Sequence, residues 1–374
     1  MLFGWLKRNK MESKPNPNYF SYMKSGIIIL FCCLFGMVGA QTENVSDSAL
    51  IALDKANQAH ALMDEAKFSA GLALMKEAAA YQPSNYSYGF EVGFINFQLK
   101  NYSEAAKQLE KWVNNQKNNA ELFQLLGNTY YILNDKVKAL NTFDLGLSKF
   151  PKSGLLYAEK GKLVQETDLG KGLFYFEKGI EVDPNFAMNY FHAALLYFKQ
   201  TESIKGILHG EIFMLLNRNT NFTAVMSELI YNAYKESVVP NTDGKCEYHF
   251  CNPNRPDHLI EIQQIEHFPA FCIMYSSLLN ASNPVVNVMT AGTMVQMRTQ
   301  ALDAYYEHHI NEHYREWVFD FQAIIKQAGH AEAYHHWVLM NGSELEFLQW
   351  KENNEDKWTA FTGWFAAHDM AIPE

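Results

Sequence analysis

One spacing of small and aromatic positions in this chain predicts a pair of packed helices. Gly127 and Ala139 lie 12 positions apart, and small residues at this spacing let two antiparallel helices approach closely. Tyr130 and Phe143 supply large side chains that fill the space between the two helices. Pro151 follows at the point where the second helix should end, because proline lacks the amide hydrogen that a helix needs.

The same spacing recurs along the chain with a period of 34 positions. The copies begin at five small residues, namely Ala59, Gly93, Gly127, Gly161 and Ala194. The second copy lacks the closing proline and has Trp112 where a small residue is usual. The fourth copy has lost one residue in its turn, and the fifth has a decayed second half. A helix pair of this kind cannot bury its apolar face alone, so successive copies are expected to stack.

The motif residues of the third copy resemble the pattern of the tetratricopeptide repeat family, and the resemblance covers residues 48–220. It implies an all-α fold, a right-handed α-solenoid of about five helix-turn-helix repeats. It also implies protein–protein interaction through the concave face, which the first helix of each pair lines. The expected role is therefore a scaffold or adaptor that binds a peptide or a partner protein.

Helical geometry selects the side chains that would line the concave groove, because positions away from the packing stripe point inward. In four successive first helices these positions are mostly aromatic or apolar, with a few polar groups among them. The predicted partner-binding residues are Phe90, Phe94, Phe97, Asn128, Tyr131, Lys162, Gln165, Phe191 and Phe198. The pattern favours an apolar or aromatic peptide segment as the ligand. The alternative is that the chain's own C-terminal domain or N-terminal helix fills the groove.

Beyond Asn219 the repeat is lost, and the remaining residues predict a helical C-terminal domain. Helices are expected over 221–238, over 259–280, over 290–327 with a break near Asn311, and in shorter stretches after that. A loop rich in proline and asparagine separates the first two. No sustained alternation predicts strands. The expected domains are an N-terminal extension with a signal peptide, the solenoid and the helical domain, at residues 1–40, 41–220 and 221–374.

The N-terminal region carries a pattern typical of export. Residues 27–38 form an apolar run of the length found in signal peptides, and it is too short for a comfortable membrane span. Lys24 supplies a positive flank, and small residues precede Gln41, before which cleavage is expected. The start of translation is Met1 or Met23. We expect a periplasmic or envelope-associated protein without a stable membrane span; the alternative is an uncleaved membrane anchor.

Three cysteines remain after the expected cleavage site. Cys246 and Cys251 enclose four residues of the predicted loop and are the expected disulfide in an oxidising compartment. Cys272 lies in an apolar stretch and is expected to be a buried thiol. Zinc ligation by the two loop cysteines with His249 and His258 is the alternative to the disulfide.

Histidines concentrate in the C-terminal region and give the sharpest enzyme hypothesis. His309 and His313 are four positions apart and would share one helical face, and His335 or His336 would complete a three-histidine metal site. Neighbouring tyrosines and tryptophans favour the other interpretation, which is aromatic packing between helices. We therefore expect no metal and no cofactor, and assign no catalytic residue.

Composition and charge narrow the function further. The chain of 374 residues is 48% hydrophobic and 14% aromatic, which is enough for a large core, and its formal net charge of −10 argues against a nucleic-acid partner. The sequence has no phosphate-binding glycine loop, no nucleophile elbow and no paired CxxC motifs. It therefore predicts an exported, non-enzymatic adaptor. The alternatives are a metal-dependent enzyme that uses its repeats to recruit substrate, and a structural subunit of an envelope complex.

Overall fold

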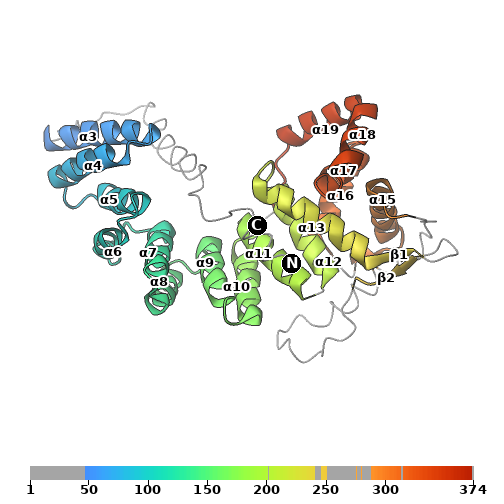
Figure 1. Cartoon of the computed structure of the whole chain (residues 1–374), viewed down its shortest axis with the longest axis horizontal. Coiled ribbons are helices and arrows are strands. Elements are labelled where there is room, and N and C mark those ends of the chain that lie inside the picture. The colour runs from blue at the N-terminus through green and yellow to red at the C-terminus, as the bar shows by residue number, and fades with distance from the viewer. Residues whose placement is uncertain are drawn as a thin grey trace, which may run out of the picture. The chain divides into compact units, whose positions relative to one another are not determined.

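The structure, a computed structural model, is helical over most of the residues that it describes (Figure 1). These are residues 47–200, 202–240, 246–250, 275, 279, 288–312 and 315–372. The chain divides into two compact units, one ending at Asp135 and the other beginning at Lys136. The expected signal peptide lies outside the described residues, and no helix within them is long and apolar enough to cross a membrane.

The described part of the first unit is a row of five helices, each packed against the next along the chain (Figure 1). They are α3 (Asp47–Asp64), α4 (Phe68–Tyr81), α5 (Tyr86–Gln98), α6 (Tyr102–Glu110) and α7 (Ala120–Ile132). Asparagines begin two of these helices. The side chains of Asn85 and Asn119 accept hydrogen bonds from the amides of Ser87 and Leu122, which satisfies donors at the exposed helix start.

The helix pairs of the first unit pack through the small residues of the repeat. A methyl group on Gly93 of α5 would lie 2.5 Å from Cδ2 of Leu109 in α6, so the two helices touch at this glycine. Gly71 of α4 makes the corresponding approach to α3, where its Cβ would lie 3.0 Å from Cγ of Met63. These are the positions that the repeat pattern assigned to close packing, and the predicted helix pairs are confirmed.

Trp112 is the departure from the repeat pattern in the second copy, and the structure shows how it is accommodated. A Cβ on Gly89 would lie 2.1 Å from the indole of Trp112, so the glycine leaves room for the ring. The Tyr86 ring meets the same indole edge-on, with 5.8 Å between ring centroids. The large Trp112 in the second half of the repeat is thus accommodated by a glycine, Gly89, in the first half.

The second unit continues the helix pairs and adds the C-terminal helices. Its described elements are α8 (Lys136–Lys149), α9 (Gly154–Val164), α10 (Leu169–Val182), α11 (Ala187–Lys199), α12 (Ser203–Leu216), α13 (Asn221–Ser237), β1 (Val238–Pro240), β2 (Cys246–Tyr248), α15 (Ala291–Glu307), the 3₁₀ helix η2 (Ile310–Glu312), α16 (Trp317–Gln327), α17 (Ala331–Leu339), α18 (Glu344–Asn353) and α19 (Glu355–Ala367). Gly161 of α9 packs on Phe176 of α10 as the repeat predicts, because its Cβ would lie 2.5 Å from Cε1 of that ring.

The described C-terminal helices follow the sequence prediction closely, with one exception. Most of the helix expected over 259–280 lies outside the described residues. The helix expected over 290–327 is divided around Asn311 into α15, η2 and α16, and His309 at the division has a left-handed φ of 56°. The exception is the short antiparallel pairing of β1 with β2, in which Val238 lies opposite Tyr248. Residues at the start of the expected loop therefore form a hairpin within an otherwise all-α fold.

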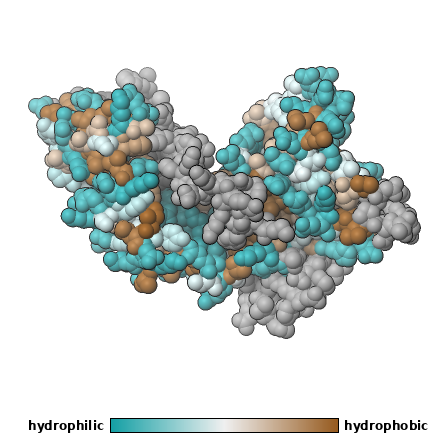
Figure 2. Space-filling model, viewed as in Figure 1, coloured by the Kyte–Doolittle hydropathy of each residue, from teal (hydrophilic) through white to brown (hydrophobic). Residues whose placement is uncertain are grey.

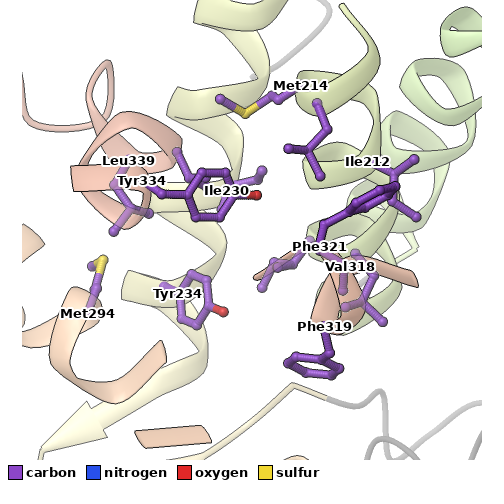
Figure 3. Packing of buried hydrophobic residues seen from close by; sticks show 14 of the residues in the cluster. Ile212, Met214, Ile230, Tyr234, Met294, Val318, Phe319, Phe321, Tyr334 and Leu339 are labelled. Carbon is purple, nitrogen blue, oxygen red and sulfur yellow. The ribbon is translucent and has the colours of Figure 1, made fainter. Parts of the chain in front are cut away.

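One buried hydrophobic cluster joins the last helix pair to the C-terminal helices. It runs from Tyr190 and Phe191 of α11 to Phe361 and Phe365 of α19. Figure 3 shows its centre, where side chains of α12, α13, α15, α16 and α17 meet. The domain boundary expected at residue 220 stays a prediction, since this core continues across it.

Candidate functional site

A hydrogen bond links the N-terminal ends of α5 and α7, the first helices of two successive repeats. The Tyr86 hydroxyl donates a hydrogen bond of 2.7 Å to Oδ1 of Asn119, the residue that caps α7. Further along α5, the buried carboxylate of Glu91 lies 2.5 Å from Nε2 of His60 in α3. The hydrogen bond to Glu91 raises the pKa of His60 above its ordinary value. Such links fix the inner-face positions of successive first helices relative to one another.

The structure corrects the expected placement of two groove residues on α5. Phe90 and Phe94 are only 6% and 4% exposed, because α5 is apolar on several sides and is surrounded by its neighbours. Phe97, one turn further on, remains partly accessible and meets Tyr102 edge-on with centroids 5.4 Å apart. Of the three predicted phenylalanines on this helix, only Phe97 presents surface to a ligand.

The end of α7 presents the most accessible apolar side chains of the predicted inner face. Tyr131 is 42% exposed and Ile132 is 43% exposed, while Asn128 is partly buried one turn earlier. These three residues and Phe97 occupy inner-face positions of two adjacent repeats, and we call them the α5–α7 face. Figure 2 shows hydrophobic side chains at the surface of these repeats among hydrophilic ones. Their partner-binding role stays a prediction.

Of the two phenylalanines predicted for the groove in the second unit, Phe191 is buried and Phe198 is partly buried. Phe191 is 3% exposed, and its ring centroid lies 5.0 Å from that of Phe213 in α12 and 5.1 Å from that of Phe222 in α13. Phe198 packs against Gly206, whose Cβ would lie 2.4 Å from the ring. Phe191 is therefore covered by the second helix of its own repeat and by α13, so at this position the alternative expectation, a groove filled by the chain itself, describes the structure.

The two polar residues predicted for the same groove remain partly accessible. Nζ of Lys162 forms an ion pair of 2.5 Å with Glu159 one turn earlier on α9. Gln165, at the end of α9, lies close to Gly172 at the start of α10. A methyl group on Gly172 would lie 2.5 Å from Cβ of Gln165. Both residues therefore make local contacts within their own helix pair, and a role in binding stays a prediction.

The three histidine candidates for a metal site that the structure describes lie in different surroundings. His335 is fully buried, and its Nδ1 accepts a hydrogen bond of 3.0 Å from Nε of Arg298, a cation that opposes metal binding there. His336 stacks on Trp350 at 4.1 Å, and burial lowers its pKa to about 4. His309 is 74% exposed and contacts Glu312. No group of three metal-binding side chains occurs within the described ranges, and His313 lies outside them.

Of the three cysteines considered in the sequence analysis, the structure describes Cys246. Cys246 is the first residue of β2 and is partly buried, and burial raises the pKa of its thiol. Cys251 and Cys272 lie outside the described residues, so the expected disulfide stays a prediction.

A buried ionic network in the second unit was not predicted from the sequence. The carboxylate of Glu211 on α12 accepts hydrogen bonds from Nη2 of Arg298, from Gln322 and from the hydroxyl of Tyr334. Arg298 also donates from Nη1 to the Tyr234 hydroxyl at 3.2 Å. Figure 3 shows Tyr234 and Tyr334 within the helical core. The one sequence signal is a glutamate directly before the apolar run 212–216 of α12.

This network is suited to holding several helices together. The buried Glu211 carboxylate accepts four hydrogen bonds, two of them charge-assisted bonds from the Arg298 guanidinium. The Arg298 side chain is 2% exposed, and Coulomb attraction to Glu211 raises its pKa although burial opposes this.

A second polar cluster lies nearer the surface, where α10, α12 and the start of α16 come together. Oε1 of Glu177 accepts a hydrogen bond of 2.6 Å from Tyr197 and lies 3.2 Å from Nε2 of His209. Burial favours the neutral acid, but His209 and Tyr197 outweigh it and hold the pKa of Glu177 below its ordinary value. Burial raises the pKa of the nearby Glu316 to about 7, against the opposing charges of His209 and Lys205.

Comparison with known proteins finds similarity among solved structures. No family model and no curated protein matches the chain. YrrB, described as a TPR protein with an unusual peptide-binding site, is 20% identical, covers 46% of this chain and 89% of its own, and has a TM-score of 0.34. TTC0263, a thermophilic TPR protein of Thermus thermophilus, is 11% identical over 48% of this chain and 98% of its own, with a TM-score of 0.40.

The PilF protein of Pseudomonas aeruginosa is 13% identical, covers 51% of this chain and 86% of its own, and has a TM-score of 0.43. At these identities and scores the comparisons say nothing of this chain's ligands. The assignment of the repeat fold rests on the 34-position motif and on the contacts at Gly71, Gly93 and Gly161, where paired helices meet. The all-α, tetratricopeptide-type repeat fold expected from the sequence is thereby confirmed.

Proposed function

We propose that this chain is a non-enzymatic interaction scaffold that binds a segment of a partner protein on its α5–α7 face. The observation that carries the proposal is the exposure of Tyr131 and Ile132 at inner-face positions, beside Leu133, which is 40% exposed. Three consecutive accessible apolar residues at the end of one helix are costly to leave in water. Such clusters on a folded protein mark sites of protein contact.

The composition of this face supports a partner segment that is apolar or aromatic. Phe97 and Tyr131 offer ring surface, and aromatic anchors supply a large share of the affinity in protein interfaces. Asn128 lies one turn before Tyr131 and carries an amide that can donate to and accept from a peptide backbone. The face therefore combines apolar anchors with one group that orients an extended or helical segment.

Export to the periplasm or cell envelope is part of the proposal. It rests on the apolar run at residues 27–38 and the small residues before Gln41. The net charge of −10 supports a protein rather than a nucleic-acid partner.

Selection of a random peptide library on the purified chain tests the proposal even though the partner is unidentified. We expect the selected peptides to be rich in aliphatic and aromatic residues. Replacing Tyr131→Ala together with Ile132→Ala should weaken their binding by about tenfold or more, as for the loss of interface anchors. Fluorescence anisotropy with labelled peptides gives the affinities.

A matched control comes from the same unit. Tyr81 on α4 is 46% exposed but lies outside the predicted inner face, so Tyr81→Ala should leave the affinities unchanged. Circular dichroism should report equal helix content for all variants. Peptides whose affinity is insensitive to the double substitution at Tyr131 and Ile132 would show that the α5–α7 face is not the binding site.

A further inference from the structure

The segment that follows α19 lies against the protein as an extended peptide. His368 has extended backbone angles, with φ of −115° and ψ of 122°. Beyond it, burial alternates with each residue: Asp369 and Ala371 are exposed, whereas Met370 and Ile372 are 4% and 3% exposed. Successive side chains of an extended segment point to opposite sides, so this alternation means that one side of the segment is seated on the protein.

One asparagine side chain binds the backbone of this segment. Nδ2 of Asn185 donates to the carbonyl oxygen of Ile372 at 2.9 Å, and the amide of Ile372 donates to Oδ1 of Asn185 at 2.8 Å. The side-chain amide thus replaces the two hydrogen bonds that a neighbouring β-strand would make to one residue. Asn185 lies just before α11, and Met370 and Ile372 join the buried cluster that α11 shares with the C-terminal helices.

An arginine fixes the point from which the segment departs. The guanidinium of Arg218 lies 3.7 Å above the ring of Phe365 and donates to the carbonyl oxygens of Phe365 and His368, the latter at 3.1 Å. These carbonyls lie at the end of α19, where a helix has acceptors without internal partners and favours a cation. Arg218 therefore ends α19 and directs the chain toward Asn185.

We propose that Asn185 and the apolar surface that buries Met370 and Ile372 form a peptide-recognition site, and that the chain's own residues 369–372 occupy it. The class of ligand is an extended peptide with two apolar side chains at alternate positions. Backbone hydrogen bonds give binding and the two apolar positions give selectivity, as in other sites that bind extended peptides. This site belongs to the second unit and shares no residue with the α5–α7 face of the first, and the inference does not depend on the function proposed for that face.

Occupation by the same chain makes the contact autoinhibitory. A tethered segment competes at an effective concentration of millimolar order, so a free peptide of moderate affinity cannot enter while the segment is seated. Weakening the segment without removing it opens the site. Only then does a peptide supplied in solution bind measurably.

A labelled peptide with the sequence of residues 366–374 tests this directly. Its binding is measured by fluorescence anisotropy to the full chain and to the full chain carrying Met370→Ser with Ile372→Ser. We expect the variant to bind the peptide at least about tenfold more tightly, because its own segment no longer competes. The peptide carrying the same two serines should bind neither protein.

Two further variants distinguish specific binding of the peptide at Asn185 from a general loosening of the protein's packing. Asn185→Asp, added to the variant chain, keeps the acceptor for the Ile372 amide but places a carboxylate against its carbonyl oxygen, and should weaken peptide binding by about tenfold, as for the loss of a buried hydrogen bond. Tyr131→Ala with Ile132→Ala should leave peptide binding unchanged. If circular dichroism shows that the double serine variant is unfolded, Ile372→Ala takes its place in the same titration.

Two results would overturn the proposal. One is equal affinity of the labelled peptide for the original chain and the folded variant, which would mean that the segment does not occupy the peptide's site. The other is no binding to the folded variant at concentrations up to about 1 mM, the order at which a tethered segment acts. In that case residues 369–372 only complete the core.

Discussion

Nη2 of Arg298 donates to both carboxylate oxygens of Glu211, at 2.8 Å each, inside the helical core of the second unit. The side chains are 2% and 0% exposed, so water screens this ion pair very little. Glu211 lies on α12, the last helix of the repeats, and Arg298 lies on α15. The pair therefore joins the repeats to the C-terminal helices by a charge contact as well as by apolar packing.

Removing one member of this pair should destabilise the protein strongly. Arg298→Met leaves the Glu211 carboxylate buried without its cation, and the expected loss is about 3–5 kcal/mol in the free energy of unfolding. Urea unfolding followed by circular dichroism measures it.

The matched control replaces both members by apolar residues. Glu211→Leu with Arg298→Met removes the unpaired charge, so it should destabilise the protein less than the sum of the two single substitutions. Additive losses would contradict the account, because they would mean that the two side chains do not interact.

Close approach of paired helices at the repeat glycines predicts a second result. Gly161→Ala places a methyl group 2.5 Å from the Phe176 ring, and the helices must separate to admit it. We expect a loss of about 1–3 kcal/mol, the usual cost of overpacking a core. The shift in the urea midpoint reports it.

Gly363 provides the control for helix propensity alone. It lies inside α19, and a Cβ there would meet nothing within 4 Å. Gly363→Ala should stabilise the protein by about 0.5–1 kcal/mol, because alanine favours the helix and meets no obstacle. Destabilisation by both alanines, or by neither, would show that helix contact at Gly161 is not the cause.

The raised pKa of Glu316 predicts a change of stability with pH. Burial raises this pKa from its ordinary value of 4.5 to about 7, so between these values the folded protein holds a proton that the unfolded chain has released. The contribution of this carboxyl is therefore fully present below pH 4.5 and falls as pH rises toward 7. The Glu316→Gln variant carries a neutral side chain at every pH. Its free energy of unfolding should therefore fall less than that of the original chain between pH 4.5 and 7.

Glu177 distinguishes this effect from a general response to pH. Its pKa is lowered despite burial, through His209 and Tyr197, so its contribution is lost as pH falls below the ordinary value rather than as pH rises. Glu177→Gln should therefore change the acid side of the stability profile. Identical profiles for Glu316→Gln and the original chain between pH 4.5 and 7 would contradict the assignment of Glu316.

The repeats were predictable because their contacts are close in sequence. Gly161 and Phe176 belong to one helix pair, and a spacing of small and large residues encodes their contact directly. The break at Asn311 was predicted from local composition in the same way. By contrast, 87 positions separate Glu211 from Arg298, and no local pattern shows which helices will carry the two charges together.

The same reason explains what the groove prediction missed. Helical periodicity gives the direction of a side chain from its own helix, and on that basis Phe191 belonged to the open inner face. Whether α12 and α13 then cover this ring depends on how the chain folds back, which periodicity does not encode. The contact of Asn185 with Ile372, across 187 positions, was hidden for the same reason.

The central claim is that the α5–α7 face contacts a partner protein. Site-specific photo-crosslinking in cells that express the protein tests this claim most directly. The photo-reactive residue p-benzoylphenylalanine replaces Ile132 in one variant. In the matched control it replaces Tyr81 on α4, which is similarly exposed. The account predicts a discrete adduct from position 132, lost when Phe97→Ala is added, and none from position 81. Adducts of equal strength from both positions, or none from position 132, would contradict it.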